Sequence, residues 1–261
     1  MMSIQDLGFI PRHPVPSFGE PSVSTNATTR AVFSPDYQNP AIRASGTLLY
    51  AFHGNTTYVL LSKHDSSDEK HACNTDKWES FGGFKEPGLT LVENAFHETW
   101  EESRGLISLS YDTTDHRGMV VFEQQNTYLQ LLVRIEYDPT LLTTFRHTRV
   151  PKPADCDPNR AYNPVMEKLE IRWVPLEDLI HDLRYVEYSV VKDKTDKETR
   201  IPHCAVWDKD RDENLHLRPA FIATMSSLVA AAPEVINQVV NQSIIHHDSP
   251  LVISDSDGRA K

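Results

Sequence analysis

The segment that constrains this chain most strongly runs from Gly82 to Leu106 and reads GGFKEPGLTLVENAFHETWEESRGL. It begins with two glycines after a short strand-like run and continues through a Pro-Gly turn into a helical pattern. Within the helix, Glu98, Glu101 and Glu102 recur at spacings of three and four residues, so they lie side by side on one face. Each close pair of like charges destabilises a helix by about 0.2–0.5 kcal/mol. The pattern predicts either a solvated acidic face or carboxylates that share a divalent cation such as Mg²⁺ or Mn²⁺.

The whole segment resembles the Nudix box, whose pattern is G-x5-E-x7-R-E-U-x-E-E-x-G-U, with U an aliphatic residue. In this alignment Gly83 is the first glycine, and Glu98, Glu101 and Glu102 are the metal-binding and catalytic glutamates. The resemblance implies that the backbone of Gly83 comes close to the metal or to a phosphate, because glycine has no side chain to obstruct the approach. A tight turn after a strand is the alternative explanation for the glycines.

Four positions depart from the pattern. Leu89 replaces its first glutamate, His97 its arginine, Thr99 its aliphatic residue and Arg104 its last glycine, with Gly105 one place later. The first two departures belong together, because in the family that glutamate and arginine are close enough to pair, and losing both leaves no unpaired charge. The three glutamates are intact, so we interpret the segment as a variant box with rebuilt supporting residues.

Other residues are further candidates for the same site. The segment EIRWVPLEDL resembles the strand that follows in Nudix domains, where an acidic residue ahead of the tryptophan faces the metal, and this makes Glu170 a metal candidate. Arg146 and Arg149 lie in a locally basic stretch and are candidates for binding substrate phosphates. Phe84 follows the glycines and is a candidate for stacking on a base. The alternatives are a charge that flanks a strand, a solvated loop and a core aromatic.

Composition limits the classes of partner. The formal charge of −11 disfavours broad binding to nucleic acid, which needs basic surface, although an RNA cap can be bound locally. A small phosphorylated substrate remains compatible, because a bound metal supplies positive charge. The three cysteines are far apart, which favours thiols over a zinc site or a disulfide framework. With neither a secretory signal nor an apolar run of membrane-spanning length, we expect a cytoplasmic protein that does not enter a membrane.

The order of predicted elements indicates an α+β fold. Strands are expected at 44–53, 57–63, 118–124, 127–137 and 169–174, and helices at 218–231 and 233–245. The resemblance implies a Nudix-like α/β/α sandwich with a mixed β-sheet. We expect an N-terminal arm at 1–42, one domain at 43–245 with an inserted loop at about 138–166 and an inserted hairpin at about 185–207, and a disordered tail at 246–261.

Two functions follow from these predictions. Resemblance to Nudix enzymes implies a hydrolase, dependent on Mg²⁺ or Mn²⁺, that cleaves a diphosphate linkage in a nucleoside diphosphate derivative or a related small phosphorylated compound. Carboxylate-held metals suit this reaction, because they neutralise phosphate charge and lower the pKa of a bound water. The alternative is a non-catalytic Nudix-like binding module for a nucleotide or a protein partner. The departures from the box favour the module, and the intact glutamates favour the enzyme.

Overall fold

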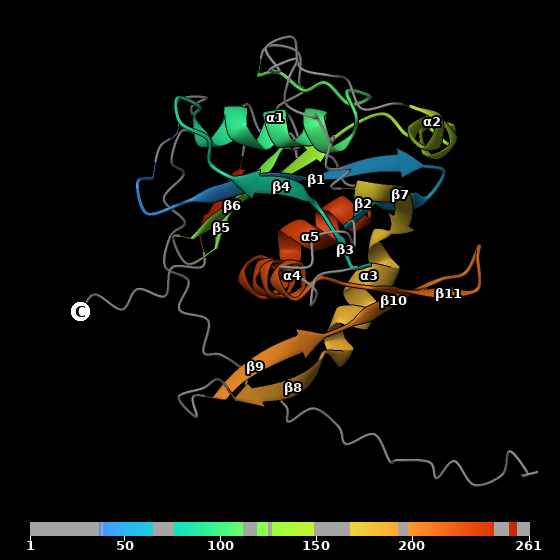
Figure 1. Ribbon diagram of the computed structural model, residues 1–261. Coiled ribbons are helices and arrows are strands. Elements are labelled where there is room, and N and C mark those ends of the chain that lie inside the picture. The colour runs from blue at the N-terminus through green and yellow to red at the C-terminus, as the bar shows by residue number, and fades with distance from the viewer. Residues whose placement is uncertain are drawn as a thin grey trace, which may run out of the picture.

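A mixed eight-stranded sheet forms the centre of the protein and carries helices on both faces (Figure 1). The structure is a computed structural model that describes residues 37, 39–64, 76–111, 119–124, 127–148, 168–192, 198–242 and 251–254. Three layers of helix, sheet and helix confirm the predicted α+β architecture.

Strand β1 (Ala44–His53) organises the sheet. It pairs antiparallel with β2 (Thr56–His64) and with β4 (Phe81–Phe84), and parallel with β6 (Tyr128–Arg134). Seven of its ten residues are buried, as expected of a strand covered on both faces. The remaining strands extend the sheet at both sides: β3 (Trp78–Glu79) and β7 (Lys168–Pro175) pair with β2, β5 (Val120–Gln124) pairs with β6, and β12 (Leu251–Ser254) pairs parallel with β5.

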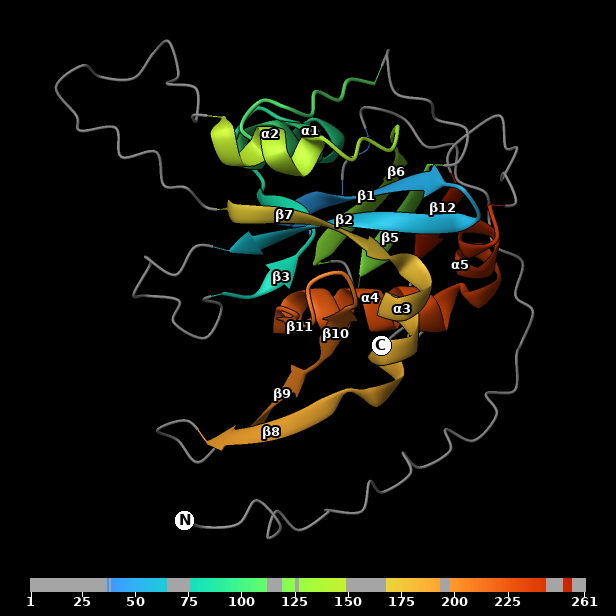
Figure 2. The ribbon, with the colours of Figure 1, turned by 90° about the vertical axis from the view of Figure 1, so that its right-hand side faces the viewer.

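The two faces of the sheet have separate hydrophobic cores. Helices α1 (Leu91–Glu102) and α2 (Leu141–His147) cover one face, and α3 (Leu176–Asp182), α4 (Pro219–Ala231) and α5 (Pro233–Val240) cover the other (Figure 2). A short 3₁₀ turn at Leu183–Tyr185 follows α3. Successive side chains of β1 pack alternately into one core and the other, because neighbouring side chains of a strand point to opposite faces. Leu48 packs in the core beneath α4, and Leu49 packs in the core beneath α1.

Outside the sheet, the predicted hairpin is present. Strands β8 (Glu187–Lys192) and β9 (Glu198–His203) pair antiparallel in a separate two-stranded sheet. A second pair, β10 (Ala205–Asp208) with β11 (Glu213–His216), follows it and was not predicted. No single helix among the described residues is long and apolar enough to cross a membrane, although α4 and α5, bent by 100°, reach that length and composition together.

Two predicted irregular segments contain regular structure. The inserted loop was expected to cover 138–166, but α2 forms inside it, because Leu141 and Phe145 lie one turn apart and are both buried. The rest of that segment from 149 onward lies outside the described residues. The prediction of a disordered tail is wrong for Leu251–Ser254, where apolar residues pair with β5 and bury Ile253 against the sheet.

Candidate active site

The start of α1 is set by a capping box. The Glu93 N–H donates to Thr90 Oγ1 at 3.1 Å, and the Thr90 N–H donates to Glu93 Oε2 at 2.7 Å. Such a cap stabilises a helix by about 1 kcal/mol and fixes the residue at which it begins. All three predicted glutamates therefore fall in the last two turns of α1, against β4.

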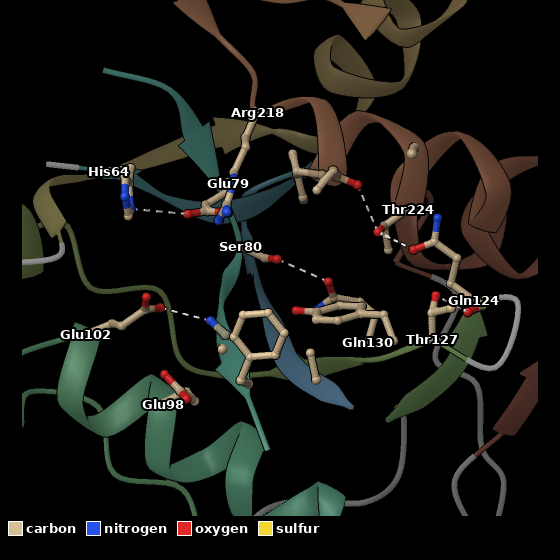
Figure 3. A pocket seen from close by; sticks show the side chains of 18 of the residues that line it. His64, Glu79, Ser80, Glu98, Glu102, Gln124, Thr127, Gln130, Arg218 and Thr224 are labelled. Carbon is tan, nitrogen blue, oxygen red and sulfur yellow. Dashed lines mark hydrogen bonds and ion pairs between the residues drawn. The ribbon is translucent and has the colours of Figure 1, made fainter. Parts of the chain in front are cut away.

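A pocket of about 660 Å³ lies between the end of α1, strands β3 and β4, and helix α4 (Figure 3). Two of the three predicted glutamates, Glu98 and Glu102, line it together with Gly83. The other polar and charged side chains around it come from five separate parts of the chain: His64, Glu79, Ser80, Gln124, Thr127, Tyr128, Gln130, Lys168, Arg218 and Thr224.

Gly83 leaves room for the carboxylate group of Glu98. A Cβ atom at Gly83 would collide with that carboxylate group, and the Glu98 side chain would have to move aside. The φ of Gly83 lies outside the left-handed region, so the backbone conformation itself does not require glycine here. The first glycine of the box thus lets the α1 carboxylate lie directly against the β4 backbone.

We expect Gly83→Ala to lower turnover by about 10²-fold, because it displaces the Glu98 carboxylate from the pocket. Steady-state kinetics measures this effect, with a substrate identified by the panel proposed under Proposed function. Gly54→Ala is the matched control: Gly54 has φ +58 and nothing within 4 Å of an added Cβ, so the substitution strains a remote turn only. The control should lose about 1 kcal/mol of stability and no activity. Equal turnover in Gly83→Ala and wild type would contradict the role of Gly83.

Glu102 is buried, and both of its carboxylate oxygens have partners. Oε2 accepts a hydrogen bond from the Gly82 N–H at 2.8 Å, and Oε1 lies 3.1 Å from Lys168 Nζ. Burial raises the pKa of Glu102 to about 8, with a further contribution from the charge of Glu79, although the Lys168 ammonium opposes the shift. Glu102 therefore binds the glycine loop to α1 and holds a proton more readily than an exposed carboxyl does.

A second buried carboxylate, Glu79, lies beside the first. Lys168 Nζ lies 2.6 Å from Glu79 Oε1, and Arg218 Nη1 lies 2.6 Å from Glu79 Oε2. Burial alone would raise the pKa of Glu79, but Lys168 and Arg218 together hold it below its ordinary value. The side chain of Lys168 is 1% exposed, so its ammonium group is a fixed cation between two carboxylates.

Glu101 lies apart from the pocket. Its side chain is 46% exposed, and Glu101 Oε2 is 3.8 Å from His97 Nδ1. The same His97 nitrogen is 3.9 Å from Glu86 Oε2. These contacts are longer than hydrogen bonds. His97, which replaces the box arginine, thus lies near one box glutamate, Glu101, and near Glu86, and it pairs with them only when it is protonated.

The donor set fits a divalent cation that prefers oxygen ligands. Glu98 and Glu102 face the pocket, and Glu101 follows on the same turn of α1. Carboxylate oxygens are the ligands that Mg²⁺ and Mn²⁺ choose, and Mg²⁺ needs only one or two from the protein. Lys168 already neutralises one Glu102 oxygen, so a metal there would share the carboxylate with the ammonium group.

The remaining predicted site residues lie in different places. Glu170 Oε1 accepts hydrogen bonds from Arg146 at 2.6 Å, Arg172 at 2.8 Å and Arg211 at 3.2 Å. Neither Glu170 nor Arg146 lines the pocket, and both belong to this ion-pair cluster. Arg149 lies outside the described residues. Phe84 is 82% exposed and lines the pocket, and its stacking on a base stays a prediction.

Sequence reasoning missed the charged residues opposite α1. Glu79, Lys168 and Arg218 are separated by up to 139 residues, and no motif connects them. The available signal was weak: Glu79 and Lys168 are charged residues at the ends of apolar strand-like runs, and the structure buries both. A buried charge is costly unless it is paired, so each of them required a partner from elsewhere.

Two departures from the box have structural explanations. Arg104, in place of the last glycine, adopts φ +61 and ends α1. Its guanidinium donates to Phe145 O at 2.7 Å and to Lys168 O at 3.1 Å, and lies 4.0 Å from the centre of the Phe145 ring. Thr99, in place of the aliphatic residue, meets Thr47 of β1 at 2.6 Å between hydroxyl oxygens. The first departure connects α1 to α2 and β7, and the second connects α1 to β1.

No family model matches the chain, and no curated protein does either. Solved structures similar to it include Nudix and MutT proteins. A C. elegans Ap4A hydrolase binary complex is 17% identical over 53% of this chain and 82% of that chain, with a TM-score of 0.31. A MutT/nudix family protein from Enterococcus faecalis is 13% identical over 79% of this chain and 70% of that chain, with a TM-score of 0.37.

A third similar structure contains a ligand. The NUDIX domain of Shewanella oneidensis NrtR, complexed with ADP ribose, is 13% identical over 57% of this chain and 82% of that chain, with a TM-score of 0.33. At these TM-scores, only part of this chain superposes on each of the three structures. The functional assignment therefore depends on the box glutamates and on the geometry of the pocket.

Proposed function

We propose that this chain is a Nudix hydrolase that depends on Mg²⁺ or Mn²⁺ and cleaves a diphosphate linkage in a nucleoside diphosphate derivative or a related small phosphorylated compound. One observation carries the proposal. Glu98 and Glu102, at the spacing of the box, face a pocket that also receives the cationic groups of Lys168 and Arg218. Carboxylates for a metal and fixed cations for phosphate charge are the two requirements of the reaction.

Each group has a role in this proposal. Glu98 and Glu102 are assigned to the metal, which when bound would neutralise phosphate charge and lower the pKa of a water molecule. Glu101, the third box glutamate, lies outside the pocket beside His97. Both oxygens of Glu102 are engaged by the Gly82 N–H and Lys168, so we assign the orientation of the attacking water to Glu98. Arg218 is 29% exposed at the pocket and is the cation that can meet a substrate phosphate directly.

A substrate panel tests the proposal. The full chain is incubated with nucleotide sugars, ADP-ribose, dinucleoside polyphosphates, capped RNA and inositol pyrophosphates in Mg²⁺ or Mn²⁺, with EDTA as the metal-free control. We expect cleavage of at least one diphosphate linkage that EDTA abolishes. If no compound is cleaved in either metal, or if cleavage survives EDTA, the chain is not a hydrolase of this class.

A binding module is the second candidate, and Lys168 is the observation that favours it. Its ammonium group already occupies the space between Glu79 and Glu102, where a cation would otherwise neutralise the two carboxylates. A module would bind a nucleotide from the same panel, measured by calorimetry, and leave it intact. Turnover of the bound compound would exclude this candidate.

The affinity for metal is expected to rise with pH up to about 8. Burial raises the pKa of Glu102 to about 8, so below this pH a metal must displace a proton from the carboxyl group. We expect the Kd for Mn²⁺ to fall by up to about tenfold per pH unit between pH 6 and 8, and to level off above. Titration of the protein with Mn²⁺ at each pH, followed by electron paramagnetic resonance, measures this Kd. Glu102→Gln should remove most of this dependence, whereas a flat wild-type profile would contradict the assignment of Glu102 to the metal.

A further inference from the structure

Gln130 of β6 has a hydrogen-bond donor that the described protein does not satisfy. The residue is 0% exposed and lines the pocket. Its Oε1 accepts a hydrogen bond from Ser80 Oγ at 3.0 Å. Its Nε2 is buried and has no hydrogen-bond partner in the structure. A buried unsatisfied donor in a native protein requires an explanation, and a ligand atom in the pocket is the simplest.

The pocket around Gln130 has two chemically different ends (Figure 3). Glu79, Glu102 and Arg218 lie at the charged end. The other end lies against β5 and α4, where Thr224 Oγ1 donates to Gln124 Oε1 at 2.7 Å. The side chains labelled at this second end are neutral: Gln124, Thr127 and Thr224. We call these residues, together with Gln130, the neutral end.

An anionic group would not be stable at the neutral end. None of the described residues that surround it is cationic. Tyr128 also lines the pocket, and its hydroxyl group is held in the neutral state because burial raises its pKa. An unpaired charge placed there would lose its hydration without compensation. The group that meets Gln130 must therefore be uncharged and must offer an acceptor atom.

We propose that the neutral end binds the heterocyclic base of a nucleotide, with a carbonyl oxygen or ring nitrogen of the base accepting a hydrogen bond from Gln130 Nε2. This inference rests on the proposed function for the position of the phosphates, which lie toward Arg218. The exposed ring of Phe84 at the pocket supplies an aromatic surface for a planar group. Gln130 is then a specificity-determining residue, since a ligand without an acceptor leaves its donor unpaired.

Equilibrium binding with and without a base tests this inference. Calorimetry compares AMP, GMP, CMP and UMP with ribose 5-phosphate, which carries the same phosphate and sugar but no base, all in Mg²⁺. We expect at least one nucleotide to bind wild type at least about tenfold more tightly than ribose 5-phosphate. Equal affinity of all five compounds would overturn the proposal, and this comparison needs no variant.

Substitutions of Gln130 then test whether the base binds at the neutral end. Gln130→Leu keeps the size of the side chain and removes the donor, and the double variant Ser80→Ala/Gln130→Leu also removes the hydroxyl group that would lose its acceptor. In both, we expect affinity for the preferred nucleotide to fall by about 10–100-fold and affinity for ribose 5-phosphate to stay unchanged. Gln238→Leu on the exposed face of α5 is the matched control and should bind as wild type does. Unchanged nucleotide affinity in the Gln130 variants would overturn the proposal.

The outcome is separable from that of the hydrolase proposal. Nucleotide binding that depends on Gln130 without cleavage of any diphosphate would support the base site and reject the hydrolase. Cleavage of diphosphates that Gln130→Leu leaves unaltered, for substrates with and without a base, would support the hydrolase and reject the base site.

Discussion

Glu98→Gln is expected to lower kcat by about 10²–10³-fold, the usual cost of removing one preorganised electrostatic group from an active site. The substitution keeps the shape of the side chain and removes the charge that a metal and an oriented water both need. The Glu98 carboxylate lies against Gly83 and lines the pocket, where both roles would be filled. Steady-state kinetics with the substrate identified by the panel, in saturating Mg²⁺ and in Mn²⁺, measures the loss.

The control for this variant lies on the same helix. Glu93→Gln removes a carboxylate from the first turn of α1 but leaves a side chain that can still complete the capping box. Turnover by Glu93→Gln should match that of wild type. If Glu98→Gln retained more than about a tenth of wild-type kcat, the box glutamates would not be the catalytic group, and the reading of this chain as a binding module would be favoured.

Lys168→Met is expected to lower the free energy of unfolding by about 3–5 kcal/mol, because it removes one partner of a buried ion-pair network. Glu79 would keep Arg218, but Glu102 would keep only the Gly82 N–H. Urea unfolding at about pH 9, where Glu102 and Lys168 are both charged, measures the loss. We also expect Mn²⁺ to stabilise Lys168→Met more than it stabilises wild type, since an ion can then neutralise the carboxylates that Lys168 leaves.

Two further variants separate charge from packing. Glu102→Gln/Lys168→Met removes both charges of the pair and should recover part of the lost stability, because no uncompensated carboxylate is left at that position. Lys209→Met removes an exposed ammonium group that lies 3.0 Å from Asp178, and it should change stability by less than about 1 kcal/mol. A loss in Lys168→Met as small as that of Lys209→Met would show that the buried network contributes little.

The acidic half of the site could be predicted because its residues are close in sequence. Glu98 and Glu102 are four residues apart on one helix, and helical periodicity alone brings them to one face. Glu101 was expected on the same face, but it lies outside the pocket beside His97. The cap at Thr90 and the glycine at Gly83 are also local signals. The strands at 44–53 and 57–63 were predictable for a similar reason, since apolar runs joined by a Gly-Asn turn specify a hairpin.

Short or weakly patterned elements could not be predicted. Helix α2 has only two buried residues, Leu141 and Phe145, which is too little periodicity to recognise among the prolines nearby. Strand β12 is four residues long, and it forms because its backbone pairs with β5 at the edge of the sheet. In both cases a surface built by other segments determines the local structure.

By itself, the sequence determined the helix that presents the glutamates, the glycine loop against which they lie and the α+β class of the fold. Only the tertiary structure decided which cations face those glutamates and where Gln130 lies. Arg218 reaches Glu79 because its N–H donates to Trp78 O at 2.9 Å and so anchors the start of α4 beside β3. Lys168 reaches both carboxylates because β7 pairs with β2. Contacts between residues up to 139 positions apart follow from strand pairing and helix docking, which no local pattern encodes.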